Sequence, residues 1–262
     1  MGNFIIGHSL LTLLSGLTIT TTSEDSSFSL DNVKNYTNLL RHYRSVTSAS
    51  DVRIAGTWGG QKALTAIMLN DVNFASVTIQ GNDTDVWTSP SFSQAFTISK
   101  DARVNRRKAY CRLTNFNYTF FSILIPAQTP DDFNVFRIGT LVPVATQIEL
   151  SQNPNWGYSW NIKTPEPRIL NFPSGQSERS SRGNIAWLNL SMNFDPFIKS
   201  YENELYTLSR IDNPEHLVIF ENFGDVPDTS KCCLCYRDTD LEVAWSHVNL
   251  IKTSRLDFTE AI

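Results

Sequence analysis

Short segments that alternate between apolar and polar residues recur along the chain, separated by Gly, Asn, Asp or Pro. In the first half, such segments cover residues 51–57, 63–69, 74–79, 93–98, 109–113, 118–125 and 134–138. Side chains of a strand point alternately to opposite faces, so a period of two predicts half-buried strands. Several short strands with turns between them are typical of a sandwich or barrel. We therefore expect a mainly β chain, with a jelly-roll-like sandwich over residues 1–150.

The second half, residues 151–262, is expected to be a second β-rich domain with one helix. Its predicted strands cover residues 156–162, 168–172, 184–194, 217–221, 241–251 and 255–259, with a polar loop over 174–183. A slip in the alternation near His247 predicts a bulge. Asp195 and Pro196 suit the cap and first position of a helix. Apolar residues then recur at helical spacing, which predicts a helix over 196–209.

The N-terminal segment, residues 4–17, is apolar but lacks a preceding positive charge, and His8 and Ser9 interrupt it. It is too short and too polar to span a bilayer. We interpret it as a first strand and turn, which predicts no membrane span and a cytosolic site of synthesis.

The composition argues against a nucleic-acid-binding surface. The net charge is −4 and charged residues make up 18% of the chain, whereas phosphate binding needs a basic field. One basic cluster is present, and we interpret it as a solvated loop or an interface patch: Arg103, Arg106, Arg107 and Lys108. The 16 Phe, 8 Tyr and 6 Trp instead favour sheet, because aromatic side chains fit a pleated surface.

No arrangement of residues predicts catalysis. None of the four His residues lies in a hydrolase or metalloprotease motif, and no Gly-rich phosphate loop is present. Adjacent carboxylates such as Asp131 and Asp132 are expected in a loop, where the sequence cannot pair them across a cleft. We therefore expect no enzymatic activity. Trp58, Trp87 and Trp156 lie near predicted loops, where they would stack on sugar rings or anchor a partner or the core.

The cysteines form the sharpest local feature. Cys232, Cys233 and Cys235 lie within four residues, and Cys111 is the fourth thiol. Thiolates select zinc or iron–sulfur clusters, so these four residues are candidate ligands, with His216 and His247 as alternatives for zinc. Neighbouring residues of an extended chain point to opposite sides, which favours reduced structural thiols instead.

The order of segments resembles that of a distal tail (tail-tip, baseplate) protein of a tailed bacteriophage. In the first half, the similarity lies in residues 5–7 with Leu10, 28–32, 66–74 with 77–79, 110–113 and 135–141, of which the last two resemble closing strands of a discoidin-like (galactose-binding-like) jelly roll. In the second half it lies in residues 156–160, the following loop, strand and helix, and a closing sheet that ends near Glu260.

This resemblance implies a structural virion protein, assembled in the host cytoplasm. It would form a homo-oligomeric ring that joins the tail tube protein to the hub or fibre proteins. It also makes an iron–sulfur cluster on the cysteines reasonable. The alternative is a carbohydrate-binding module on a virion or cell surface, because a discoidin-like fold implies sugar binding at its loop tips.

Overall fold

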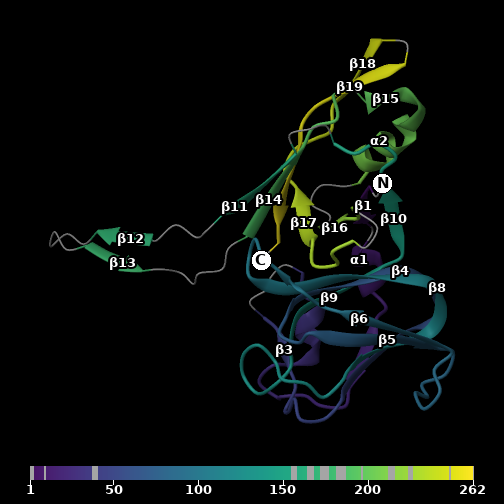
Figure 1. Cartoon of the computed structure of the whole chain (residues 1–262), viewed down its shortest axis with the longest axis vertical. Helices are drawn as coiled ribbons and strands as arrows, with labels where there is room; N and C mark the ends of the chain where they lie inside the picture. The colour runs from purple at the N-terminus through teal and green to yellow at the C-terminus, as the bar shows by residue number, and fades with distance from the viewer. Residues whose placement is uncertain are drawn as a thin grey trace.

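The computed structural model describes residues 3–8, 10–36, 41–154, 158–163, 168–171, 177–180, 187–195, 197–211, 216–223, 227–247 and 249–261. The protein is mainly β, as the sequence predicts, with a jelly-roll-like sandwich and a second sheet beside one principal helix. In Figure 1 the sandwich lies at the bottom, the second sheet above it, then the helix, and the small sheet of residues 197–198, 243–247 and 250–253 at the top. No helix among the described residues is long and apolar enough to cross a membrane.

The sandwich is built on two long strands that pair along their length. They are β4 (Val52–Val72) and β8 (Arg106–Ile125), and their register shifts between Thr57 and Lys62 and again between Leu64 and Ala66. This pair of strands, named here the β4–β8 ribbon, contributes to both layers of the sandwich, because the two halves of β4 pair with different strands. Its first half pairs with β2 (Thr18–Thr21) and its second half with β9 (Arg137–Val144).

Four shorter strands complete this sheet. They are β3 (Tyr43–Arg44), β5 (Ser76–Asn82), β6 (Phe92–Thr97) and β7 (Lys100–Asp101). The enclosed core includes Ile54, Ile67, Ile79 and Phe121, all fully buried. Gly56 is required here, because a Cβ at that position would overlap the Phe121 ring. Because β4 and β8 are each continuous, the predicted segments 51–57 and 63–69 belong to one strand, β4. The segments 109–113 and 118–125 likewise belong to β8.

The second sheet has seven strands in the order β10-β1-β16-β17-β20-β14-β11. Their bounds are Thr146–Glu149, Phe4–His8, His216–Glu221, Cys232–Arg237, Leu256–Glu260, Trp187–Met192 and Ser159–Lys163. The first strand of the chain pairs with β10 on one side and β16 on the other. A domain division at residue 150 stays a prediction, but this sheet takes strands from both sides of that residue.

Strict alternation divides the side chains of the second sheet between two cores. Ile5, Val218 and Leu234 face the sandwich, where they pack with Met68 and Val142 in an interlayer core. Their neighbours along each strand, such as Ile6, Ile219 and Cys233, face the opposite way, into a core shared with the helix. Because both faces of the central strands are covered, their sequences are apolar at consecutive positions.

The principal helix begins later than predicted. α2 spans Glu202–Ser209 and follows a short 3₁₀ turn, η2 (Lys199–Tyr201). Residues 197 and 198 instead form β15 (Phe197–Ile198), which pairs with β19 (Leu250–Thr253). The expected helix start at residue 196 is thus wrong, because residues 197 and 198 pair with β19 and the Phe197 ring packs in the core beside that of Phe194.

Further predictions are corrected or confirmed locally. Residues 4–17 contain β1 and a short helix, α1 (Leu10–Leu14), rather than a strand and turn alone; a 3₁₀ turn, η1 (Leu30–Lys34), follows. The expected loop 174–183 includes β13 (Ser177–Ser180), which pairs with β12 (Arg168–Asn171). The bulge predicted near His247 is confirmed by a register shift between β18 (Val243–His247) and β19.

Candidate functional site

A charged pocket lies at the end of the β4–β8 pair where β4 ends and β8 begins, beside the loop that leads into β9. It has a volume of about 210 Å³, and its described lining residues are Asp71, Val72, Asn73, Lys100, Asn105, Arg106, Arg107, Asp131, Asp132 and Arg137. These come from the end of β4, from β7, from the start of β8 and from the loop into β9. Val72 is the only apolar side chain among these described residues, so the pocket suits a polar ligand.

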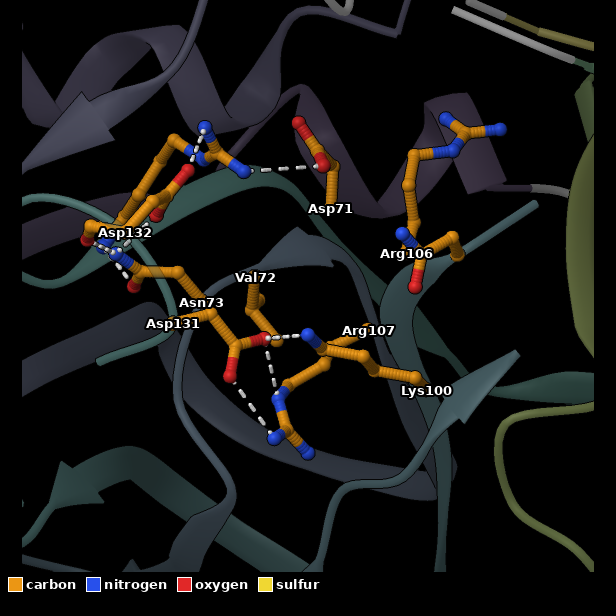
Figure 2. Close-up of a pocket in the computed structure, with 10 residues that line it drawn as sticks. Asp71, Val72, Asn73, Lys100, Arg106, Arg107, Asp131 and Asp132 are labelled. Carbon is orange, nitrogen blue, oxygen red and sulfur yellow. Dashed lines mark hydrogen bonds and ion pairs between the residues drawn. The ribbon is translucent and has the colours of Figure 1, made fainter. Parts of the chain in front are cut away.

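Ion pairs hold the pocket's side chains in place. Arg107 donates from Nε and Nη2 to the two oxygens of Asp131, at 2.8 and 3.0 Å, and Lys100 Nζ lies 3.2 Å from the same carboxylate. On the other side, Arg137 lies between Asp132, at 3.1 Å, and Asp71, at 3.4 Å. Figure 2 shows Asp71 and Asp132 on one side of the pocket and Asp131 with Arg107 on the opposite side.

Asn73 anchors the loop that carries two of these carboxylates. Its side chain is 1% exposed, and its Nδ2 donates to the backbone oxygens of Asp132 and Val135 and to Asp132 Oδ1, each at 2.9 Å. Its Oδ1 accepts from the backbone N–H of Arg137 at 2.8 Å. One buried amide thus fixes the position of both Asp132 and Arg137 before any ligand arrives.

Backbone strain is concentrated around the pocket. Asp71, Asn105 and Phe133 each have a φ of 52°. Asp and Asn tolerate this left-handed conformation, whereas Phe adopts it rarely, and such residues cost about 1–3 kcal/mol each. Gly139 permits the close approach of the strained turn, because a Cβ there would lie 2.9 Å from Asp71 Cβ. Strain of this kind clusters at binding and catalytic sites.

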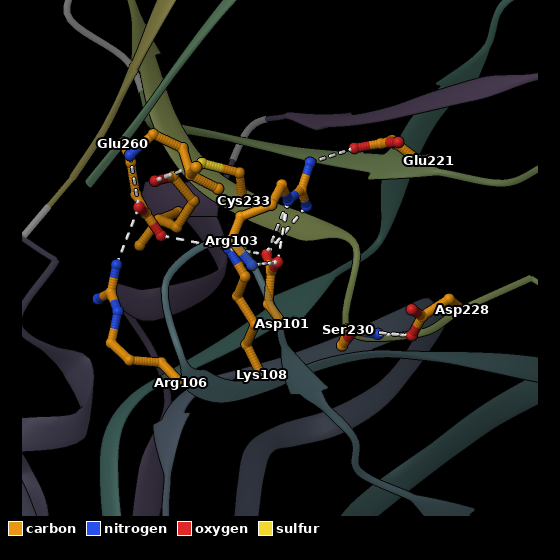
Figure 3. Close-up of polar contacts among 11 residues, drawn as sticks. Asp101, Arg103, Arg106, Lys108, Glu221, Asp228, Ser230, Cys233 and Glu260 are labelled. Atoms are coloured by element: carbon orange, nitrogen blue, oxygen red, sulfur yellow. Dashed lines mark hydrogen bonds and ion pairs between the residues drawn. The ribbon is translucent and has the colours of Figure 1, made fainter. Parts of the chain in front are cut away.

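A second charged cluster lies between the sandwich and the seven-stranded sheet (Figure 3). Lys108 is fully buried, with its Nζ 3.1 Å from Asp101 Oδ2 and 3.4 Å from Glu260 Oε1. Arg106 pairs with Glu260 at 2.9 Å, and the backbone N–H of Leu188 donates to the same carboxylate at 2.9 Å. These bonds connect β7 and β8 of the sandwich to β20 and β14.

Arg103 extends this cluster to a third strand of the seven-stranded sheet. It bonds to both oxygens of Asp101 and lies 2.6 Å from Glu221 Oε1 at the end of β16. Its guanidinium also lies 4.5 Å from the centre of the Trp160 ring. Three cations thus face three carboxylates. The basic cluster expected on a solvated loop or interface patch is therefore largely internal, and only Arg107 of its four members belongs to the pocket without joining this network.

The electrostatics of the buried cluster favour a clamp over a reactive centre. Burial opposes the charged form of Lys108, but nearby negative charges, Glu260 foremost, outweigh it and raise the pKa. Burial likewise disfavours the ionised form of Asp101, yet hydrogen bonds from Arg103 and the charge of Lys108 lower its pKa overall. A lysine held protonated is a poor nucleophile or base, so the cluster fits a structural role.

The predicted sugar-stacking residues lie in different environments. Trp58 packs 5.2 Å from Phe121, and its indole N–H donates to the Leu13 backbone oxygen at 2.6 Å, so it belongs to the sandwich core. Trp87 lies in the β5–β6 loop, where its N–H donates to Asp85 and its ring faces Arg53 at 5.3 Å. Trp156 lies outside the described residues. Neither Trp58 nor Trp87 lines the pocket.

The four thiols are distributed over three cores. Cys111 faces the sandwich core, Cys232 faces the interlayer core, and Cys233 and Cys235 face the core beside the helix. All four are free and buried. Within the described ranges, no three His, Cys, Asp or Glu residues are grouped to hold a metal ion. Metal binding by these cysteines stays a prediction, and the fold does not bring all four thiols together.

The alternative zinc ligands add no further grouping. His216 lies opposite Tyr236 in the β16–β17 register, on the face that carries Leu234 rather than the face of Cys233 and Cys235. Burial lowers its pKa. The side chain of His247 lies outside the described residues.

The pocket could not be identified from the sequence. Asp131 and Asp132 are visible as an acidic pair in a loop, but their partners Arg107 and Arg137 belong to separate strands. The pairing of β8 and β9 on either side of the end of β4, together with the Asn73 contacts to the loop before β9, brings these segments together. The one local signal is Asn70-Asp71, a polar pair that interrupts an apolar strand and marks the strained turn.

The chain matches no family model, and no curated protein matches its sequence. Solved structures with partial similarity include chitosan-binding module 1 from a chitosanase/glucanase of Paenibacillus sp. IK-5. It is 12% identical with a TM-score of 0.40, over 50% of this chain and 96% of that one. The lectin domain of lectinolysin, complexed with Lewis B antigen, is 7% identical with a TM-score of 0.38, over 51% and 96%.

A GH29 fucosidase from Ruminococcus gnavus, complexed with fucose, is 12% identical with a TM-score of 0.40 over 51% of this chain. The match spans about a quarter of the fucosidase, 26% of its length. Identities and TM-scores this low do not transfer a ligand or an activity to this chain. They leave the pocket and its ion pairs as the basis for a functional proposal.

Proposed function

We propose that the chain is a non-catalytic binding module that holds a saccharide unit in the charged pocket. One observation carries this proposal: the pocket walls are ion pairs, each of which presents donors beside acceptors. A sugar hydroxyl both donates and accepts, so it can bond to the cation and the carboxylate of one pair together. The cavity, about 210 Å³, is smaller than the roughly 300–1,000 Å³ of typical ligand pockets and suits one small polar unit.

The state of the carboxylates supports binding rather than hydrolysis. A general acid that cleaves a glycosidic bond needs a raised pKa. Here hydrogen bonds from Arg107, together with Lys100, lower the pKa of Asp131 despite its partial burial. Asp71 and Asp132 are both paired with Arg137. The described lining residues also include no Ser, Cys or His that could act as a nucleophile or base.

A glycan array followed by calorimetry tests this function. Asp132→Asn keeps the size of the side chain but removes the charge that pairs with Arg137. We expect it to weaken binding at least about tenfold, which corresponds to about 1.4 kcal/mol. The matched control is Asp240→Asn, because the Asp240 side chain is 88% exposed and outside the pocket. The proposal fails if no glycan binds, or if both variants bind as the unmodified chain does.

A second candidate function is structural assembly, as in the tail tip of a phage virion. The β12–β13 hairpin favours it. The chain leaves the sheet after the edge strand β11, forms this hairpin and returns as β14, which pairs with β11. In Figure 1 the hairpin lies far from both sheets. Two-stranded hairpins are marginally stable alone, so contact with another chain would stabilise this one.

The edge strand adds a second docking element to the same region. β11 has no second neighbour among the described strands, and Ile162 on it is 51% exposed. Open edges of this kind accept a strand from a partner. In this candidate function, β11 and the hairpin join copies into a ring and contact tail tube and hub or fibre proteins. The chain would then reside in the virion.

Native mass spectrometry tests assembly. Replacement of residues 168–180 by a short Gly-Ser linker removes the hairpin and leaves the β11–β14 pairing. We expect the full chain to form a closed oligomer and the shortened chain to remain monomeric with an unchanged melting temperature. The same oligomeric state for the two chains, both monomeric or both oligomeric, would exclude the hairpin as the assembly element.

A further inference from the structure

The two sides of the pocket carry opposite net charge. On one side, Lys100 and Arg107 share the single carboxylate of Asp131. On the other side, Asp71 and Asp132 share the single guanidinium of Arg137. The first side, named here the donor wall, has an excess of one positive charge, and the second, the acceptor wall, an excess of one negative charge. Arg106 adds no excess, because it pairs with the buried Glu260.

Hydrogen-bonding capacity follows the same division. Three donors of Arg107 are used, two on Asp131 and one on the Ile98 backbone oxygen, and an arginine has five. Lys100 contributes further donors from a side chain that is 43% exposed and can turn toward a ligand. Asp131 already accepts two bonds from Arg107 and lies 3.2 Å from Lys100 Nζ, and its side chain is only 27% exposed. The donor wall therefore offers unused donors without an unused acceptor of matching strength.

The acceptor wall is complementary. Asp71 accepts from Arg137 through Oδ1 alone. Each oxygen of Asp132 accepts one bond, from Asn73 or from Arg137, and its side chain is 41% exposed, so it can accept more. A carboxylate can accept several hydrogen bonds, so these two residues can accept hydrogen bonds from ligand hydroxyls. The rigid Asn73 contacts keep Asp132 and Arg137 in place while they do so. A ligand that fits both walls has an anionic group at one end and hydroxyl donors at the other.

We propose that the saccharide unit bound here is acidic, with a carboxylate such as that of a uronic acid on Lys100 and Arg107 and its hydroxyls on Asp71 and Asp132. This inference rests on the saccharide-binding function proposed above. Arginine and lysine bond to carboxylates through short, charge-assisted hydrogen bonds, which are about twice as strong as neutral ones. A neutral hexose would occupy the same volume but leave the excess charge of the donor wall unmatched.

Glucuronic acid and glucose are a matched pair of probes, because they differ only at the carboxylate. We expect NMR titration of the full chain to show glucuronic acid binding about tenfold more tightly than glucose, as for one added charge-assisted bond. Added salt should reduce this ratio, since partly exposed charges are screened. Lys100→Gln should abolish most of the preference, because it removes the ammonium that pairs with the carboxylate of glucuronic acid and should weaken glucuronic acid binding more than glucose binding.

The control is Lys62→Gln, which removes an exposed lysine at the bend of the ribbon, outside the pocket. It should retain the full preference for glucuronic acid. Equal affinity of the unmodified chain for both sugars would overturn the acidic ligand and leave the saccharide function standing. Binding of neither sugar would overturn both. Inorganic phosphate that displaces glucuronic acid with equal affinity, while glucose fails to bind, would identify a plain anion site and would also overturn both.

Discussion

Removal of the buried charge of Lys108 should be among the most damaging single changes in the molecule. Its ammonium group is fully buried between Asp101 and Glu260. Lys108→Met keeps most of the volume but leaves three carboxylates facing two arginines. Loss of one partner from a buried ion pair typically costs about 3–5 kcal/mol. Both carboxylates keep an arginine, so we expect the lower end, about 3 kcal/mol.

Urea unfolding followed by circular dichroism measures this loss directly. Thermal unfolding is a second measurement. For a chain of this size, a loss of about 1 kcal/mol in the free energy of unfolding lowers the melting temperature by about 2–4 °C, so Lys108→Met should lower it by about 6–12 °C. Lys62→Met is the control, because Lys62 is exposed, and it should change stability by less than about 0.5 kcal/mol. If Lys108→Met matches this control, Lys108 does not hold the layers together.

A double-mutant cycle separates charge balance from packing. Glu260→Gln alone leaves an excess positive charge, whereas Lys108→Met with Glu260→Gln restores equal numbers of cations and carboxylates. The double variant should lose about 1–2 kcal/mol less than the sum of the single variants, since contacting charges are not additive. Strict additivity would refute the argument that the cluster acts as one balanced unit.

Three further outcomes follow from the same contacts. Gly56→Ala should cost about 1–3 kcal/mol in urea unfolding because its Cβ meets the Phe121 ring, whereas Gly60→Ala, with no atom within 4 Å, should be neutral. Trp58→Phe should cost about 1 kcal/mol through loss of its hydrogen bond, measured the same way. The pKa of Asp101 is lowered in the folded chain, so its ionised carboxylate stabilises the fold above about pH 4, and this stabilisation is lost as the pH falls through the folded pKa. Between about pH 4 and pH 2, Asp101→Asn should therefore lose less stability than the unmodified chain.

Local periodicity predicted most strands but not their division into layers. Residues 63–69 read as one apolar run because both faces are covered, Ile67 by the sandwich core and Met68 by the interlayer core. Such a run does not specify which sheet lies on which side. The placement of β1 beside β16 depends on pairing across more than 200 residues, as between Ile5 and Phe220. No pattern within either strand encodes that partner.

The charged residues are harder to interpret than the apolar ones. The charge of Lys108 favours a solvated loop or an interface patch, although alternation along β8 places it on the same face as the buried Tyr110. The partner of Lys108, Glu260, is 152 residues away along the sequence, and no local pattern pairs the two. The pocket residues have the same difficulty, because each ion pair joins separate segments. A single sequence therefore predicts where charges interrupt apolar strands, but not which charges meet.

The Cys-Cys-x-Cys run has a packing explanation that can be separated from metal binding. On β17, Cys232 faces the interlayer core and Cys233 and Cys235 face the core beside the helix. A strand covered on both faces needs small apolar side chains at consecutive positions, which cysteine provides. Burial also raises the pKa of Cys232 and Cys235, which disfavours the thiolate form that metals require.

Replacement of these three cysteines by alanine distinguishes the two explanations. If they only pack, each loss should cost about 1 kcal/mol, and the variant should remain folded with a lower urea midpoint. If they hold a metal or cluster, its binding free energy is part of the folding free energy, and the variant should unfold. Elemental analysis of anaerobically purified, unmodified chain completes the test. Stoichiometric iron or zinc in the unmodified chain, and its absence from the alanine variant, would contradict the packing explanation. Thiols that lie on opposite faces of β17 would then have to rearrange around the ion.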